Sequence, residues 1–102
     1  MQTYLVSYDI SDNNLRFKAA KQLLRAGAFR VQRSVFMGTL TEAGAKQLRK
    51  SLAGLAVSNR WGTEDTVLIL PLHEYSRQQL ELLGNFTTEW SLIYREMHTL
   101  VL

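Results

Sequence analysis

The segment "DTVLILPL" constrains the fold of this chain more than any other stretch. It is apolar without interruption from Val67 to Leu72, and a strand that is apolar on both faces needs cover on both faces. The rest of the chain offers only two long amphipathic helices, which suffice for one side of a sheet. The second side therefore needs another cover, and a partner subunit is the simplest candidate.

The N-terminal segment "YLVSYDIS" predicts another strand, because its side chains alternate between two faces. Tyr4, Val6 and Tyr8 fall on one face, which we expect to lie under the helices. The opposite face carries Leu5 and ends in the single carboxylate of Asp9. Asp9 either serves chemistry at the end of the strand or caps the following helix, and the pattern leaves both roles open.

Two helices follow the usual start and stop signals. Ser11 or Asp12 caps the first, which stops at Gly27, and Thr39 or Thr41 starts the second. Apolar residues at helical spacing form the stripes expected to face the sheet. These stripes are Phe17, Ala20, Leu23 and Leu24 in the first helix and Ala45, Leu48, Leu52 and Leu55 in the second.

The remaining apolar segments complete an α+β domain. "RVQRSVFMG" predicts one strand from about Arg30 to Met37, and "QQLELLGN" predicts a fourth strand, because a βαββαβ order closes with strand four beside strand one. "MHTLVL" predicts an additional C-terminal strand. We therefore expect one domain over residues 1–84 and a C-terminal extension over residues 85–102, used for dimer or partner contacts.

Composition limits the class of protein. The chain has 102 residues, a net charge of +3 and no cysteine, so a metal site would use oxygen or imidazole ligands. Residues 1–50 hold nine Lys and Arg against three Asp and Glu, and residues 51–102 hold three against six. The basic half suits nucleic acid or simply a solvated surface. No apolar run reaches the ~18 residues of a membrane span, so we expect a cytoplasmic protein without membrane contact.

Taken together, these segments resemble one known family. The order and spacing of "YLVSYDIS", "NLRFKAAK", "RVQRSVFMG", "LTEAGAKQL" and "DTVLILPL" are similar to those of the small CRISPR-associated adaptation protein that accompanies the CRISPR integrase and is often described as a metal-dependent endoribonuclease. The resemblance covers about Tyr4 to Leu72. It implies a ferredoxin-like fold and a homodimer through the sheet faces, which would cover the apolar strand.

The resemblance also implies site residues. Asp9 matches the proposed ligand of a divalent metal, which we expect to be Mg²⁺, and Ser34 is a second catalytic candidate. Basic residues of the family match Arg16 and Lys18 early in the first helix and Arg30 on the second strand. We expect these three to bind nucleic acid.

Strand alternation adds a condition to this site. Arg30, Ser34 and Phe36 share one side of the predicted second strand. If that is the side of Asp9, Arg30 binds phosphate and Ser34 positions water or metal. Met37 stands where the family commonly has an acidic residue, so we expect fewer acidic side chains around the site.

The dimer implied by the resemblance would bring a second Asp9 carboxylate to the site. Across a two-fold axis Asp9 meets its own copy, and the pair could hold one Mg²⁺ between subunits. For the interface itself we predict Leu5, Phe36 and Leu68.

A basic stripe runs along the exposed side of the first helix. It consists of Lys18, Lys21 and Arg25, which we predict to contact nucleic acid. The alternative is a solvated helix face. The second helix carries Lys46, Arg49 and Lys50 outside its apolar stripe.

Two functions of different classes follow. One is a metal-dependent endonuclease or endoribonuclease that acts on single-stranded RNA or DNA through paired Asp9. The other is a non-catalytic adaptor that bridges integrase units on DNA during spacer acquisition. A toxin-like ribonuclease of the virulence-associated protein D type is a weaker alternative. We favour participation in spacer acquisition, with the enzyme retained as a hypothesis.

Overall fold

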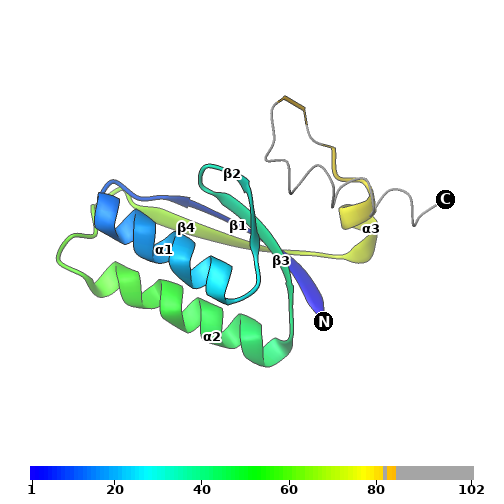
Figure 1. Ribbon diagram of the computed structural model, residues 1–102, viewed down its shortest axis with the longest axis horizontal. Helices are drawn as coiled ribbons and strands as arrows, with labels where there is room; N and C mark the ends of the chain where they lie inside the picture. The colour runs from blue at the N-terminus through cyan, green and yellow to red at the C-terminus, as the bar shows by residue number, and fades with distance from the viewer. Residues whose placement is uncertain (82, 85–102) are drawn as a thin grey trace.

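The computed structural model describes residues 1–81 and 83–84, which form an antiparallel sheet with two long helices lying side by side on it (Figure 1). The four strands have the order β2-β3-β1-β4. The elements are β1 (Gln2–Asp9), α1 (Asn13–Arg25), β2 (Phe29–Gln32), β3 (Val35–Leu40), α2 (Glu42–Ala53), the 3-10 turn η1 (Gly54–Val57), β4 (Thr66–Leu72) and α3 (Glu74–Gln78). This order confirms the predicted α+β class with a ferredoxin-like βαββαβ arrangement. Within the described residues, no helix has both the length and the hydropathy to cross a membrane.

Both long helices begin at predicted caps. The Asp12 carboxylate accepts a hydrogen bond from the Leu15 amide, and the Thr41 hydroxyl accepts one from the Gly44 amide, each at 3.0 Å. Gly27 follows α1 with a φ of 93°, a backbone conformation that favours glycine. The caps fix where each helix starts relative to the strand before it.

The apolar stripe predicted for α1 is only partly right. Leu23 is fully buried, but Phe17 is 69% exposed and Leu24 is 54% exposed. The buried face contains Leu15 and Ala19 instead, because residues four apart lie on one side of a helix. Phe17 and Leu24, two turns apart, form a separate exposed stripe.

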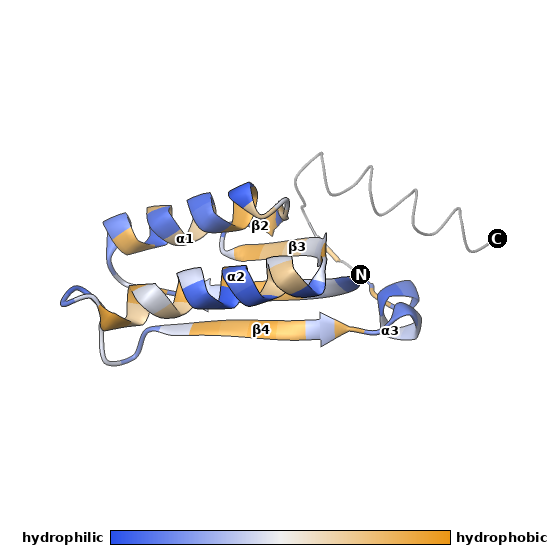
Figure 2. Ribbon diagram, turned by 90° about the horizontal axis from the view of Figure 1, so that it is seen from below, coloured by the Kyte–Doolittle hydropathy of each residue, from blue (hydrophilic) through white to orange (hydrophobic). Residues whose placement is uncertain are grey.

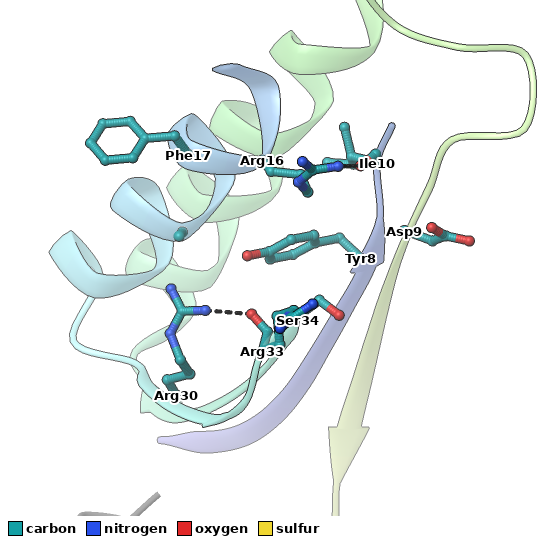
Figure 3. A pocket seen from close by; sticks show the side chains of 9 residues that line it. Tyr8, Asp9, Ile10, Arg16, Phe17, Arg30, Arg33 and Ser34 are labelled. Atoms are coloured by element: carbon teal, nitrogen blue, oxygen red, sulfur yellow. Dashed lines mark hydrogen bonds between the residues drawn. The ribbon is translucent and has the colours of Figure 1, made fainter. Parts of the chain in front are cut away.

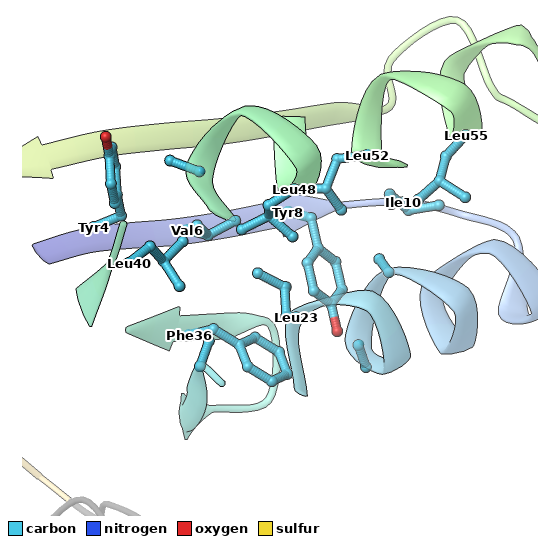
Figure 4. Close-up of a cluster of buried hydrophobic side chains, with 14 of the residues drawn as sticks. Tyr4, Val6, Tyr8, Ile10, Leu23, Phe36, Leu40, Leu48, Leu52 and Leu55 are labelled. Atoms are coloured by element: carbon cyan, nitrogen blue, oxygen red, sulfur yellow. The ribbon is translucent and has the colours of Figure 1, made fainter. Parts of the chain in front are cut away.

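The main core lies between the two long helices and the sheet (Figure 4). From β1 it receives Tyr4, Val6 and Tyr8, which confirms the predicted alternation. The helices contribute Leu15, Ala19, Leu23, Ala45, Leu48 and Leu52. Since this face of β1 is filled, the side chains on its other face are left for other roles.

The segment predicted as one strand, Arg30 to Met37, is a hairpin. β2 and β3 pair antiparallel on either side of a turn at Arg33 and Ser34, and their register shifts between Arg30 and Gln32. The prediction missed this turn because a run of apolar and polar residues without glycine or proline also fits a continuous strand. The turn and the register shift interrupt the alternation on which the predicted side of Ser34 depended.

Phe36 shows the consequence of that turn. It is fully buried in the core under the helices, and its partner across the hairpin is Arg30. Asp9 lies on the opposite face of the sheet, since its neighbour Tyr8 is in the core. The prediction of Phe36 at a dimer interface is therefore wrong, because the side chain has no exposed surface to offer a partner.

The predicted fourth strand is also reassigned. In its described residues, "QQLELLGN" contains no strand, and its first residue ends α3. The position beside β1 belongs to β4, which pairs with β1 from Thr3↔Leu72 to Asp9↔Thr66. The hairpin supplies the extra strand, so the βαββαβ order needs no further one. The predicted strand "MHTLVL" and the extension over residues 85–102 lie outside the described residues.

The sheet face opposite the helices is only partly covered. Val31 and Met37 are buried there, and Leu80 from the segment after α3 packs against them. On β4, however, Leu68 is 58% exposed and Leu70 is 44% exposed, and Figure 2 shows β4 as a nearly continuous apolar strand. The expectation that two helices cover one side of this strand is confirmed, and among the described residues the leucines on its other side are left partly exposed.

Candidate functional site

A cavity of about 610 Å³ opens at the end of β1, between α1 and the hairpin turn (Figure 3). It brings together four of the predicted site residues, Asp9, Arg16, Arg30 and Ser34. Its complete lining is Tyr8, Asp9, Ile10, Arg16, Phe17, Ala20, Arg30, Arg33 and Ser34. Three arginines therefore border one cavity, a composition suited to binding phosphate groups.

Arg16 is held by the turn that joins β1 to α1. Its guanidinium donates to the carbonyl oxygens of Ile10 and Ser11, each at 2.9 Å. Both acceptors belong to the backbone just before the Asp12 cap, so the start of the helix fixes the position of the arginine. A guanidinium carries five N–H donors, and these two bonds leave donors that can be directed at a ligand.

Arg30 is held by the hairpin. Its guanidinium donates to the carbonyl oxygen of Arg33 and lies 4.8 Å from the centroid of the Phe36 ring. Phe36 in turn stacks on Tyr8, with ring centroids 6.1 Å apart. The amide of Tyr8 donates to the carbonyl oxygen of Ser34 at 3.1 Å. These contacts join the hairpin turn to the end of β1. They hold Arg30 beside the cavity on the helix-covered face of the sheet.

Asp9 borders the same cavity from the other side of β1. Figure 3 shows its carboxylate turned away from Tyr8 and from both Arg16 and Arg30. The residue is exposed, because alternation places it on the open face of the sheet. The condition stated for Arg30, that it lies on the side of Asp9, is therefore not met.

The donor set around Asp9 decides how a divalent metal could bind. Among residues 1–81 and 83–84, no three histidine or acidic side chains are grouped closely enough to hold a metal ion. Mg²⁺ usually keeps several waters and is held by one or two carboxylates, so Asp9 alone provides the minimum protein contribution to such a site. A second copy on the open face would add a second carboxylate to the one that the described residues offer at the end of β1.

A neighbouring loop supports the turn that carries Arg16. The Asp65 carboxylate accepts hydrogen bonds from the amides of Gly62 at 2.7 Å and Ser11 at 3.0 Å. The bond from Gly62 is the main reason that the pKa of Asp65 lies below its ordinary value of 3.8. A Cβ at Gly62 would come within 3.0 Å of the Ser11 hydroxyl, so glycine fits this close approach. The loop therefore stabilises the β1–α1 turn from outside.

The predicted basic stripe lies on the exposed side of α1. Lys21 and Arg25 line a second cavity of about 440 Å³ together with Phe17, Ala20, Leu24 and Arg30. Lys18 is exposed but borders neither cavity. On α2, Arg49 lies over the Tyr4 ring at 5.6 Å, so part of its guanidinium surface is used within the protein.

Three residues of this region were missed by the sequence patterns. Arg33 was overlooked because the turn that presents it was not recognised. Phe17 was assigned to the core from its spacing, and Tyr8 was treated only as a core aromatic, although its hydroxyl points into the cavity (Figure 3). The tripeptide "QRS" between two β-branched residues is the one signal that suggests a short turn.

Comparison with known proteins adds to this description. A sequence profile described as "CRISPR associated protein Cas2" matches residues 1–80. The chain is 35% identical over 68 residues to a Korarchaeum cryptofilum protein named CRISPR-associated endoribonuclease Cas2. The aligned region covers 67% of this chain and 69% of that relative.

Solved structures share the fold of this chain. A hypothetical protein from Thermus thermophilus is 33% identical, and its crystal structure superposes with a TM-score of 0.67 over 83% of this chain and 93% of that one. Streptococcus pyogenes Cas2 shares the fold with a TM-score of 0.62 at 22% identity, over 80% of this chain and 99% of that one. The profile match spans both β1 and β4 and therefore includes every element of the candidate site. The chain belongs to the Cas2 family of CRISPR-associated proteins.

Proposed function

We propose that this protein acts in CRISPR spacer acquisition as a homodimer that binds nucleic acid and bridges integrase units. We further propose a Mg²⁺-dependent hydrolysis of phosphodiester bonds at Asp9. Membership of the Cas2 family supports the CRISPR role, and relatives named endoribonucleases support the hydrolysis. The observation that carries the proposal is the cavity at the end of β1, which three arginines border, with Asp9 at its edge and the Asp9 carboxylate directed to the open face of the sheet.

The homodimer is supported by the open face of the sheet. Leu5, Leu68 and Leu70 lie there in register, since Leu5 pairs with Leu70 on β4 and Ser7 pairs with Leu68. Exposed apolar side chains that form a contiguous surface mark association sites. A two-fold axis through this face would put the same surface on both partners and bring the two Asp9 carboxylates to a common interface.

Each group would have a distinct task. Arg16, Arg30 and Arg33 would bind and orient phosphate groups through charge-assisted hydrogen bonds, and Lys18, Lys21 and Arg25 would extend this contact along α1. The paired Asp9 carboxylates would hold Mg²⁺, which supplies charge neutralisation and an activated water. Ser34, half-buried at the cavity, would orient a phosphate oxygen by hydrogen bonding.

A specific observation favours the adaptor function on its own as the second candidate. Within the described residues of one chain, Asp9 has no acidic cluster around it, whereas the cationic groups on α1 and the hairpin do not depend on a metal. Bridging integrase units requires shape and phosphate contacts only. The toxin-like ribonuclease has no comparable observation in its favour.

The substitution Asp9→Asn separates the two candidates. It preserves the size of the side chain but removes the charge needed to hold Mg²⁺, so Mg²⁺-dependent cleavage of single-stranded RNA should fall by a factor of about 100 or more. Integration by the partner integrase should continue at the wild-type rate. Both activities are measured on the same purified dimer.

Glu64→Gln is the matched control, since it removes an exposed carboxylate from the loop before β4. It should change neither activity. Cleavage that persists in Asp9→Asn would refute hydrolysis at Asp9 and leave the adaptor function. Loss of integration in an intact Asp9→Asn dimer would instead show that the adaptor function also depends on this carboxylate.

A further inference from the structure

Phe17 is the most unusual apolar residue near the candidate site. Its side chain is 69% exposed, and Figure 3 shows the ring turned outward from α1, away from Tyr8 and β1. It makes no contribution to the core beneath α1, which is filled by Leu15, Ala19 and Leu23. Packing of the domain therefore does not explain a phenylalanine at this position.

The ring stands between two cavities. The first, at the end of β1, contains Arg16 and Arg33, and the second, along α1, contains Leu24 and Lys21. Phe17, Ala20 and Arg30 border both. The two cavities are thus neighbours that share Phe17. Arginines suited to phosphate line the first cavity, and the second has an apolar surface with cations at its edge.

We propose that Phe17 is a stacking residue for one unpaired base of single-stranded nucleic acid. The base lies on the exposed ring in the second cavity, and the adjoining phosphate lies in the first cavity against Arg16 and Arg33. This inference rests on the proposed binding of nucleic acid and adds a preference for unpaired strands, which it assigns to one residue. A duplex keeps its bases stacked on each other and offers none to the ring.

Charge decides between a nucleic acid and an apolar peptide as the occupant. Arg16, Lys21, Arg25, Arg30 and Arg33 surround the two cavities, and Asp9, the acidic residue in the lining, points to the other face of the sheet. Aromatic rings set in cationic grooves bind single strands by stacking on bases while the cations track the backbone. A peptide that used only Phe17 and Leu24 would bring no negative charge to this positively charged surface.

The test compares the binding of Phe17→Ala and wild type to two fluorescein-labelled strands, each twelve nucleotides long. One strand is oligo(dT), and the other is an abasic strand with the same number of phosphates. Stacking is lost only where bases exist, so Phe17→Ala should weaken oligo(dT) binding about tenfold and leave abasic binding unchanged. The slope of log Kd against log salt should stay the same for both proteins, because no phosphate contact is removed.

Three further variants make the result specific. Phe17→Trp should retain tight binding, Phe17→Leu should be weakened like Phe17→Ala, and Val57→Ala, which trims an 86% exposed apolar side chain elsewhere, should match wild type. Equal oligo(dT) binding by wild type and Phe17→Ala, or wild-type binding by Phe17→Leu, would overturn the stacking role. Wild-type protein that binds neither strand would instead overturn the proposed binding of single-stranded nucleic acid, so the two failures are distinguishable.

Discussion

On the helix-covered face of the sheet, Tyr4, Val6 and Phe36 are buried under α1 and α2. On the opposite face, Leu68 and Leu70 are partly exposed. Both faces are built from apolar strand residues, so hydropathy alone does not distinguish them. The difference is that the described residues bury one face and leave the other partly exposed. The first face should therefore set the stability of the protomer, and the second should set its association.

The largest expected effect comes from truncating a leucine on the closed face. Leu23 is fully buried, so Leu23→Ala removes buried methyl groups and leaves a cavity, which should lower the free energy of unfolding by about 2–5 kcal/mol. Leu68→Ala, the matched change on the open face, should cost the isolated protomer about 1 kcal/mol or less. Urea denaturation at low protein concentration measures both. Equal losses would mean that the two faces do not differ in this way.

A charge on the open face should act on association instead. Leu68→Asp places a carboxylate in the proposed interface, where it meets its own copy across the two-fold axis, so the dimer should weaken at least about tenfold. Sedimentation equilibrium at micromolar concentration gives the subunit dissociation constant, and circular dichroism checks that the fold persists. Val57→Asp is the control for charge alone. A Leu68→Asp protein that remains fully dimeric would move the interface elsewhere.

The smallest effect concerns the loop that supports the Arg16 turn. The pKa of Asp65 is lowered in the folded protein, chiefly by the Gly62 amide, so the ionised carboxylate stabilises the fold above the ordinary value of 3.8 and this contribution is lost as the pH falls through the folded pKa. Asp65→Asn should therefore lower the urea midpoint at pH 7, and the two proteins should converge in acid. A midpoint difference that is independent of pH would assign the effect to packing rather than charge.

Local patterns were sufficient to predict much of the fold. The alternation of β1 identified Tyr4 and Tyr8 as core residues. The cap candidates, Ser11 or Asp12 and Thr39 or Thr41, located the two long helices to within two residues. The doubly apolar strand β4 indicated a face without its own cover. These features depend on residues close in sequence, which is why a single sequence reveals them.

The site was predicted less completely, because it depends on one unrecognised turn. Without the turn at Arg33 and Ser34, Phe36 was assigned to the face of Asp9, and Arg33 was not considered at all. Helical spacing also did not show that Phe17 falls outside the sector of α1 that the sheet covers, since an apolar residue near the edge of a stripe fits both sides. Tertiary packing decides these positions.

The adjacency of Tyr8 and Asp9 has a consequence for how β1 pairs with its neighbours. In the observed register Tyr8 is buried and Asp9 is exposed. A slip of β1 by one residue would exchange the two faces, placing a carboxylate beneath the helices and a tyrosine on the open side. An unpaired buried carboxylate is strongly unfavourable, so the charge at the end of β1 penalises the misaligned sheet whether or not it ever meets a metal ion.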